Sequence, residues 1–153
     1  MSVKEKLQDY ALVAEIIGGV AIVASLIFVG LQIQQGTSIT RAASYQDFVE
    51  ELNDWRSLLL TDSEIRRLFL ISSRAEDMSD LEADERLSLG ILYGNLFSIL
   101  ESAYYSREYG LIGNPEWERI KLGLCDNFNQ TRRAQINVRY LSEEFRSYMR
   151  DNC

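Results

Sequence analysis

The longest apolar segment of the chain lies near its N-terminus, where eighteen consecutive residues from Ile16 to Ile33 carry no charge. A helix of that length rises about 27 Å, close to the thickness of the hydrocarbon core of a bilayer. Glu5, Asp9 and Glu15 precede the segment, which does not suit the basic start of a signal peptide. The pattern therefore predicts a retained transmembrane helix. The alternatives are a removed signal peptide and a buried core helix of a soluble protein.

One face of this predicted helix carries small side chains. Ala14, Gly18, Ala21 and Ser25 recur at spacings of four, three and four residues. Small residues at this spacing let the backbones of two helices approach closely within a membrane. We therefore expect these four residues to form a helix-packing interface, either with a second copy or with another membrane protein. The alternative is a chance pattern in a span rich in alanine and glycine.

The residues after the anchor follow a helical pattern. Apolar side chains recur at helical spacing within a predicted helix at about 38–60, which either continues from the anchor or restarts at Gly36-Thr37. Capping signals begin four more helices, at Thr61, Ser79, Asn114-Pro115 and Ser142, which we expect to end near Ile71, Tyr109 (before Gly110), Phe128 and Arg150. The sequence thus predicts an all-α protein. Residues 1–36 form the N-terminal flank and transmembrane anchor, and residues 37–153 form a small antiparallel helical bundle.

Acidic and basic residues are distributed unevenly over the chain, whose net charge is −7. Residues 47–85 hold twelve acids and four arginines, whereas residues 119–150 hold seven bases and three acids. The two segments are expected either to pack against each other in one bundle or to make head-to-tail contacts between subunits. The net negative charge argues against nucleic acid as a partner, because contacts with phosphate groups need clustered lysine and arginine.

The sequence contains no motif for catalysis, cofactor binding or metal binding. Histidine is absent, which removes the commonest metal ligand and the commonest general base near neutral pH. The segment from Glu101 to Tyr104 has tyrosine where the Glu-x-x-His motif of di-iron proteins has histidine. We therefore predict no catalytic residue, no cofactor and no metal.

Glu101 is the acid that stands out within the long apolar helix, and we expect it to be buried. A buried carboxylate needs a partner. The candidates are an arginine such as Arg132 or Arg133, or the neighbouring Tyr104. A second hypothesis makes Glu101 and Tyr104 part of a pocket for a small ligand.

The orientation of the anchor is weakly encoded. Lys4 and Lys6 precede the span and Arg41 follows it, which favours a cytoplasmic N-terminus and an exported domain by two charges to one. Cys125 and Cys153 match no zinc or redox motif. We expect free thiols, with a disulfide as the alternative if the domain faces an oxidising compartment.

Three segments resemble a bacterial family of short single-span membrane proteins, defined by a domain of unknown function. They are Ser25–Thr37 (SLIFVGLQIQQGT), Arg41–Gln46 (RAASYQ) and Glu101–Ile112 (ESAYYSREYGLI). The resemblance implies a single N-terminal span in the bacterial inner membrane and a helical domain, and it implies no activity.

Two functions follow as hypotheses. The first is a non-enzymatic interaction or scaffold module that is anchored in the bilayer and self-associates through its span. The second is a small-ligand sensor or enzyme with a pocket in the bundle around Glu101.

Overall fold

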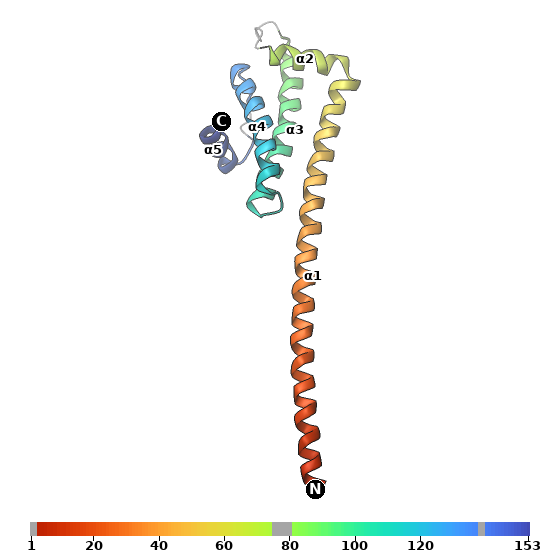
Figure 1. Ribbon diagram of the computed structural model, residues 1–153. Helices are drawn as coiled ribbons and strands as arrows, with labels where there is room; N and C mark the ends of the chain where they lie inside the picture. The colour runs from red at the N-terminus through yellow and green to blue at the C-terminus, as the bar shows by residue number, and fades with distance from the viewer. Residues whose placement is uncertain (1–2, 75–80, 138–139) are drawn as a thin grey trace. The chain divides into compact units, whose positions relative to one another are not determined.

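The computed structural model describes residues 3–74, 81–137 and 140–153, with side chains from Glu15 onward. These residues form five helices and no strand, which confirms the predicted all-α class (Figure 1). The chain divides into two compact units, Met1–Thr40 and Arg41–Cys153. The helices are α1 (Val3–Thr61), α2 (Ser63–Ser73), α3 (Ala83–Glu108), α4 (Asn114–Arg133) and α5 (Glu143–Asn152).

The first unit is the N-terminal part of α1. All of its side chains from Glu15 to Thr40 are exposed, and the segment is long and apolar enough to cross a membrane. The helix does not restart at Gly36-Thr37. The hydroxyl groups of Thr37 and Thr40 donate to the carbonyls of Ile33 and Gly36, at 2.9 and 3.0 Å, so these polar side chains bond within the helix.

The second unit is a helical bundle around α3. Helix α3 packs against α2 and α4, and α4 also packs against α5. The C-terminal part of α1 joins this core through Phe48 and Trp55, which are buried. It is also held by two hydrogen bonds, from Trp55 Nε1 to the Leu92 carbonyl (2.9 Å) and from Arg41 Nε to the Gly110 carbonyl (2.8 Å). These bonds join the C-terminal part of α1 to α3 and to the turn that follows α3.

The helix ends differ from the sequence predictions by a few residues. Asp62, not Thr61, caps α2, because its carboxylate accepts the N–H groups of Glu64 and Ile65 at 2.9 and 3.1 Å. The predicted start of the long helix, Ser79, lies outside the described residues, and the described helix begins after Glu82. Helix α4 continues to Arg133, five residues beyond the predicted end. The prediction for Ser142 is confirmed, since its hydroxyl accepts the Phe145 N–H.

Helices α3 and α4 end in the same motif with different residues at the left-handed position. Gly110 has φ +71° and Gln135 has φ +54°. After α3, Gly110 N bonds to the Arg107 carbonyl (2.8 Å) and Leu111 N bonds to the Ser106 carbonyl (2.7 Å). After α4, Gln135 N bonds to the Arg132 carbonyl (3.3 Å) and Ile136 N bonds to the Thr131 carbonyl (2.9 Å). Glycine adopts a positive φ without steric cost, whereas glutamine does not.

We therefore expect opposite effects at these two positions. Gly110→Ala should lower the free energy of unfolding by about 1–2 kcal/mol, and Gln135→Gly should raise it by up to about 1 kcal/mol. Denaturant unfolding of the full chain in mild detergent, followed by circular dichroism, measures both. Gly90→Ala within α3 is the control and should be neutral or stabilising, because an added Cβ meets nothing within 4 Å. Equal effects of Gly110→Ala and Gly90→Ala would contradict the assignment.

Candidate functional site

One hollow of the bundle is a largely apolar groove of about 420 Å³. Helix α1 forms one wall, α4 forms the other, Leu96 and Leu100 of α3 lie between them, and Phe69 of α2 completes the lining. Its volume lies within the range of about 300–1,000 Å³ that is typical of small-molecule sites. We call it the α1–α4 groove, and its lining residues are Tyr45, Phe48, Val49, Leu52, Trp55, Arg56, Phe69, Leu96, Leu100, Arg119, Ile120, Gly123 and Asn127.

Trp55 is held rigidly in the wall of the α1–α4 groove. Its indole N–H donates to the Leu92 carbonyl, and its ring meets Phe69 edge to face with the centroids 5.8 Å apart. The polar edge of Trp55 is therefore satisfied by the protein. The indole N–H is therefore not available to a ligand, and Trp55 contributes apolar surface to the lining.

Two cationic side chains lie among the lining residues, and both are exposed. The guanidinium of Arg56 contacts the Asn53 side-chain oxygen at 3.4 Å, which is a neutral partner. The guanidinium of Arg119 lies 3.7 Å from the carboxylate of Glu116, one turn earlier on α4. An apolar groove with arginine on both walls combines a hydrophobic surface with positive charge.

The sequence did not single out this groove. The apolar spacing of Tyr45, Phe48, Leu52 and Trp55 predicts a core-facing stripe, and Phe48 and Trp55 are indeed buried. Tyr45 and Leu52 stay partly exposed because α1 and α4 do not close on each other there. The one sequence feature that could have indicated the groove is Arg56, which follows this apolar stripe. A single arginine beside an apolar stripe is not distinctive.

Glu101 and Tyr104 lie apart from the lining of the α1–α4 groove. Glu101 is half-buried, and its carboxylate accepts the backbone N–H of Ser142 at 2.8 Å. The partner of Glu101 is therefore Ser142, the N-cap residue of α5. It is not Arg132, Arg133 or Tyr104, as the sequence led us to expect. Glu101 supports the start of α5, where a negative charge is favourable.

Tyr104 belongs to an aromatic cluster that joins α3, α4 and α5. Its ring lies 6.1 Å from Trp117, 5.3 Å from Phe145 and 4.9 Å from Tyr148, measured between centroids. Burial is the main cause that raises the pKa of Tyr104, with smaller contributions from nearby carboxylates. This packing gives Tyr104 a structural role.

A buried polar cluster joins α2, α3 and α4. The hydroxyls of Ser72 and Tyr93 are 2.9 Å apart, and the Gln130 amide donates to both of them. Ser72 and Tyr93 have no exposed surface. Burial raises the pKa of Tyr93 to about 12, and the hydrogen bond with Ser72 partly opposes this shift. Gln130 is partly exposed, whereas the two hydroxyls lie inside the core, so the hydrogen bonds of the cluster satisfy buried polar groups.

The raised pKa of Tyr93 predicts a loss of stability in strong base. Above pH 10 an unfolded tyrosine loses its proton, whereas Tyr93 in the folded protein keeps it until about pH 12. The unfolded state then binds fewer protons, so the free energy of unfolding falls between pH 10 and 12, by about 2–3 kcal/mol from this residue.

Tyr93→Phe should flatten that pH dependence in denaturant titrations at pH 9, 10, 11 and 12. Some slope remains, since burial also raises the pKa values of Tyr104 and Tyr140. Tyr109→Phe is the control, because Tyr109 is 77% exposed. The prediction is wrong if the free energy of unfolding of Tyr93→Phe falls between pH 10 and 12 as steeply as that of the unaltered protein.

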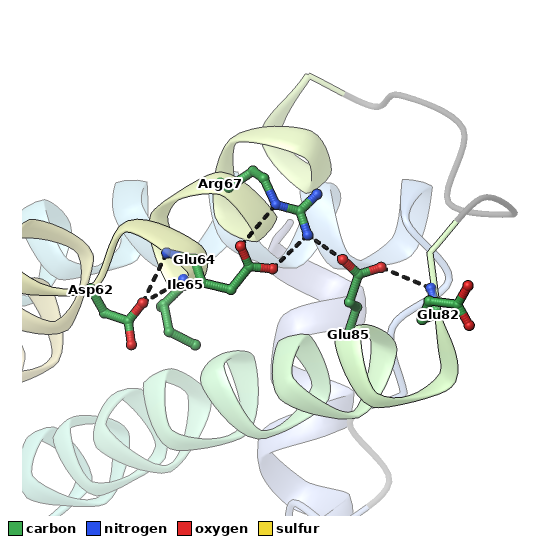
Figure 2. A network of polar contacts seen from close by, with 6 residues as sticks. All are labelled: Asp62, Glu64, Ile65, Arg67, Glu82 and Glu85. Carbon is green, nitrogen blue, oxygen red and sulfur yellow. Dashed lines mark hydrogen bonds and ion pairs between the residues drawn. The ribbon is translucent and has the colours of Figure 1, made fainter.

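An ion-pair network on the surface links α2 to α3. Figure 2 shows the guanidinium of Arg67 between the carboxylates of Glu64 and Glu85, and Glu85 also accepts the backbone N–H of Glu82. The hydrogen bond from Arg67 lowers the pKa of Glu64, and the two carboxylates raise that of Arg67. The network links the start of α3 to α2 through Nε and Nη2 of Arg67.

The ion pairs of the described residues are local. Arg67 pairs within the acidic segment 47–85, and Arg146 and Arg150 both pair with Glu143 inside the basic segment 119–150. Helices α2 and α4, which belong to the two segments, do pack against each other, and the contribution of charge complementarity to that packing stays a prediction.

Cys125 and Cys153 form a disulfide, so the expectation of free thiols is wrong. Their Cα atoms are 4.9 Å apart, within the range that a disulfide spans. The bond joins α4 to the end of α5. Over the part of the chain that the structure describes, no group of three or more cysteine and acidic side chains is placed to hold a metal ion.

The predicted helix-packing residues lie in the first unit. Gly18, Ala21 and Ser25 are exposed, and a Cβ added at Gly18 would meet nothing within 4 Å. The side chain of Ala14 is outside the described residues. The role of these residues in helix packing stays a prediction.

Comparisons with family models, with curated proteins and with solved structures returned no match. The resemblance to the bacterial single-span family therefore rests on the sequence segments alone and stays a prediction.

Proposed function

We propose that the protein is a single-span protein of the bacterial inner membrane whose helical domain is a non-enzymatic interaction module. The observation that carries this proposal is the exposure of every side chain from Glu15 to Thr40 on a helix with an eighteen-residue uncharged core. Such a surface is unfavourable in water and favourable in lipid. A core helix of a soluble protein would instead be buried.

We place the bundle on the oxidising side of the membrane. The disulfide between Cys125 and Cys153 supports this orientation, because disulfides persist outside the reducing cytoplasm. Lys4 and Lys6 before the span point to the same orientation. Treatment of intact cells with a membrane-impermeant reductant and then a maleimide should label both cysteines. Labelling that requires permeabilised cells would reverse the orientation.

Membrane anchoring itself is tested by extraction. The full chain expressed in bacteria should stay in the membrane pellet at alkaline pH and be released by detergent. Replacing Ile22 and Leu26 by glutamate and lysine breaks the uncharged run and should release the chain into the soluble fraction. Recovery of the unaltered protein in the soluble fraction would refute the proposal.

Self-association of the span is expected to depend on Gly18. In a reporter of transmembrane dimerisation, Gly18→Leu should reduce the signal at least tenfold, because a bulky side chain separates the two backbones. Val20→Leu is the matched control and should leave the signal unchanged, because Val20 lies on the face opposite the small residues, with Ile16, Val23 and Ile27. Equal signals from the two variants would show that the small-residue face is not the interface.

A further inference from the structure

We propose that a hollow between α4 and α5 binds the dianionic phosphate group of a phosphate monoester. The hollow has a volume of about 460 Å³ and is lined by Phe128, Arg132, Arg146 and Arg150. Phe128 and Arg132 lie one turn apart on α4, and Arg146 and Arg150 lie one turn apart on α5. Each helix therefore contributes one row of side chains to the hollow, and three of the four side chains are cationic.

The guanidinium groups of Arg146 and Arg150 are close enough to share one anion. Nη2 of Arg146 lies 2.6 Å from one carboxylate oxygen of Glu143, and Nη2 of Arg150 lies 2.9 Å from the other oxygen. Glu143 thus shows that a single anionic group reaches both arginines at the distance of a charged hydrogen bond. The side chain of Glu143 is 69% exposed, so solvent reaches this arrangement.

Glu143 balances only part of the positive charge at the hollow. Of the acids that the structure describes, Glu143 alone pairs with the lining arginines, whereas Glu144 accepts from the Tyr105 hydroxyl at 3.3 Å. The guanidinium of Arg132 lies 5.8 Å from the centre of the Phe128 ring, a contact that positions its charge without neutralising it. Two positive charges therefore remain, and they match the charge of about −1.5 to −2 on a phosphate monoester at pH 7.

Arg146 also has an unused hydrogen-bond donor. Its Nε is buried and has no hydrogen-bond partner among the described residues. Buried polar groups in native proteins are nearly always paired, and a bound ion is one of the partners that completes such a group. Arginine donates paired N–H groups to carboxylates and phosphates alike, but a phosphate group offers three strong acceptor oxygens where a carboxylate offers two. The number of donors around the hollow therefore favours phosphate.

Calorimetric titration of the full chain tests the proposal. With the protein in phosphatidylcholine nanodiscs and a phosphate-free buffer, phenyl phosphate should bind saturably at one site per chain. Phenyl sulfate has the same ring and a single negative charge, so it should bind at least tenfold more weakly. The site belongs to the bundle alone, so the affinity for phenyl phosphate should be the same in mild detergent as in nanodiscs.

Matched variants locate the site on the two helices. Arg132→Gln and Arg150→Gln should each weaken the binding of phenyl phosphate at least fivefold. Arg133→Gln is the control and should change it less than twofold, because Arg133 adjoins Arg132 on α4 but is not part of the lining. Glu143→Gln removes the internal anion and should strengthen binding at least threefold, whereas Glu144→Gln, which removes the same charge one residue further on, should change it less than twofold.

The phosphate group belongs either to a soluble ester or to a phospholipid, and competition distinguishes the two sources. Nanodiscs that contain phosphatidic acid, which is a phosphate monoester, should inhibit the binding of phenyl phosphate if the site takes a lipid head group. Phosphatidylglycerol, a phosphodiester, is the control for the surface charge of the nanodisc. Equal binding in both kinds of nanodisc assigns the site to a soluble ester.

Three results would overturn the proposal. The first is the absence of saturable binding of phenyl phosphate, and the second is equal binding of phenyl phosphate and phenyl sulfate. The third is equal weakening by Arg132→Gln and Arg133→Gln, which would show that overall charge and not the hollow attracts the anion. If Arg150→Gln disturbs α5, as judged by circular dichroism, Arg132→Gln on the other helix carries the comparison. Release of the protein from membranes at alkaline pH refutes anchoring and leaves the titration results unaffected.

Discussion

Replacing Cys153 by serine is expected to lower the free energy of unfolding by about 3–4 kcal/mol. The disulfide closes a loop of 28 residues between α4 and the end of α5, and a loop of this size restricts the unfolded chain by roughly that amount. Helix α5 has ten residues, which is too short to be stable in isolation. Its attachment therefore depends on this bond and on the aromatic cluster.

Denaturant unfolding of the full chain in mild detergent, with and without dithiothreitol, measures this effect. Cys125→Ser and Cys153→Ser should destabilise equally, and the double variant should be no worse than either, because each change removes the same bond. Dithiothreitol should affect only the unaltered protein. An unfolding midpoint of the unaltered protein that does not respond to dithiothreitol would exclude a structural disulfide and remove one support for an exported bundle.

Trp117→Ala is expected to cost about 3–5 kcal/mol, the largest effect of a single core change in this domain. Trp117 is 1% exposed, its ring lies 5.7 Å from Tyr148, and its indole N–H donates to the Tyr148 hydroxyl at 3.0 Å. The guanidinium of Arg107 lies 5.6 Å from the centre of the same ring. Alanine leaves a cavity and removes all of these contacts.

Trp117→Phe separates the contribution of ring packing from that of the indole N–H hydrogen bond. Phenylalanine keeps most of the ring packing and removes the N–H donor, so a loss of about 1–2 kcal/mol is expected. Leu122→Ala on the same helix is the control, because Leu122 is 71% exposed and should change stability by less than about 0.5 kcal/mol. Small domains have free energies of unfolding of about 5–15 kcal/mol. A loss of about 3–5 kcal/mol therefore leaves Trp117→Ala folded enough for its unfolding to be measured over most of that range. A loss below about 1 kcal/mol in Trp117→Ala would show that the cluster does not hold α4 to α5.

The arrangement of helices along the chain was predictable because its signals are local. Ser142 caps α5 through its own hydroxyl, and Gly110 ends α3 at a positive φ that few other residues adopt. One error, at the start of α2, arose because two adjacent residues can serve as the cap. Thr61 and Asp62 are both good caps, and only the path of the chain between α1 and α2 selects Asp62.

The partners of the polar side chains were not predictable. Glu101 is 41 residues from Ser142, so their hydrogen bond depends on how α5 returns to α3. The acidic and basic segments complement each other in total charge, yet Arg67 and Arg146 pair with acids within their own segments. An ion pair needs an approach within about 4 Å, which net charge does not specify.

By itself, the sequence of this protein determined an uncharged apolar helix near the N-terminus and a succession of amphipathic helices after it. Hydrophobic spacing and capping depend on residues three or four positions apart, so they act before any tertiary contact forms. Only the tertiary structure decided that Cys125 meets Cys153 and that Arg56 and Arg119 line one apolar groove. Those pairs are separated by 28 and 63 residues, and their distances follow from the packing of α1, α3, α4 and α5.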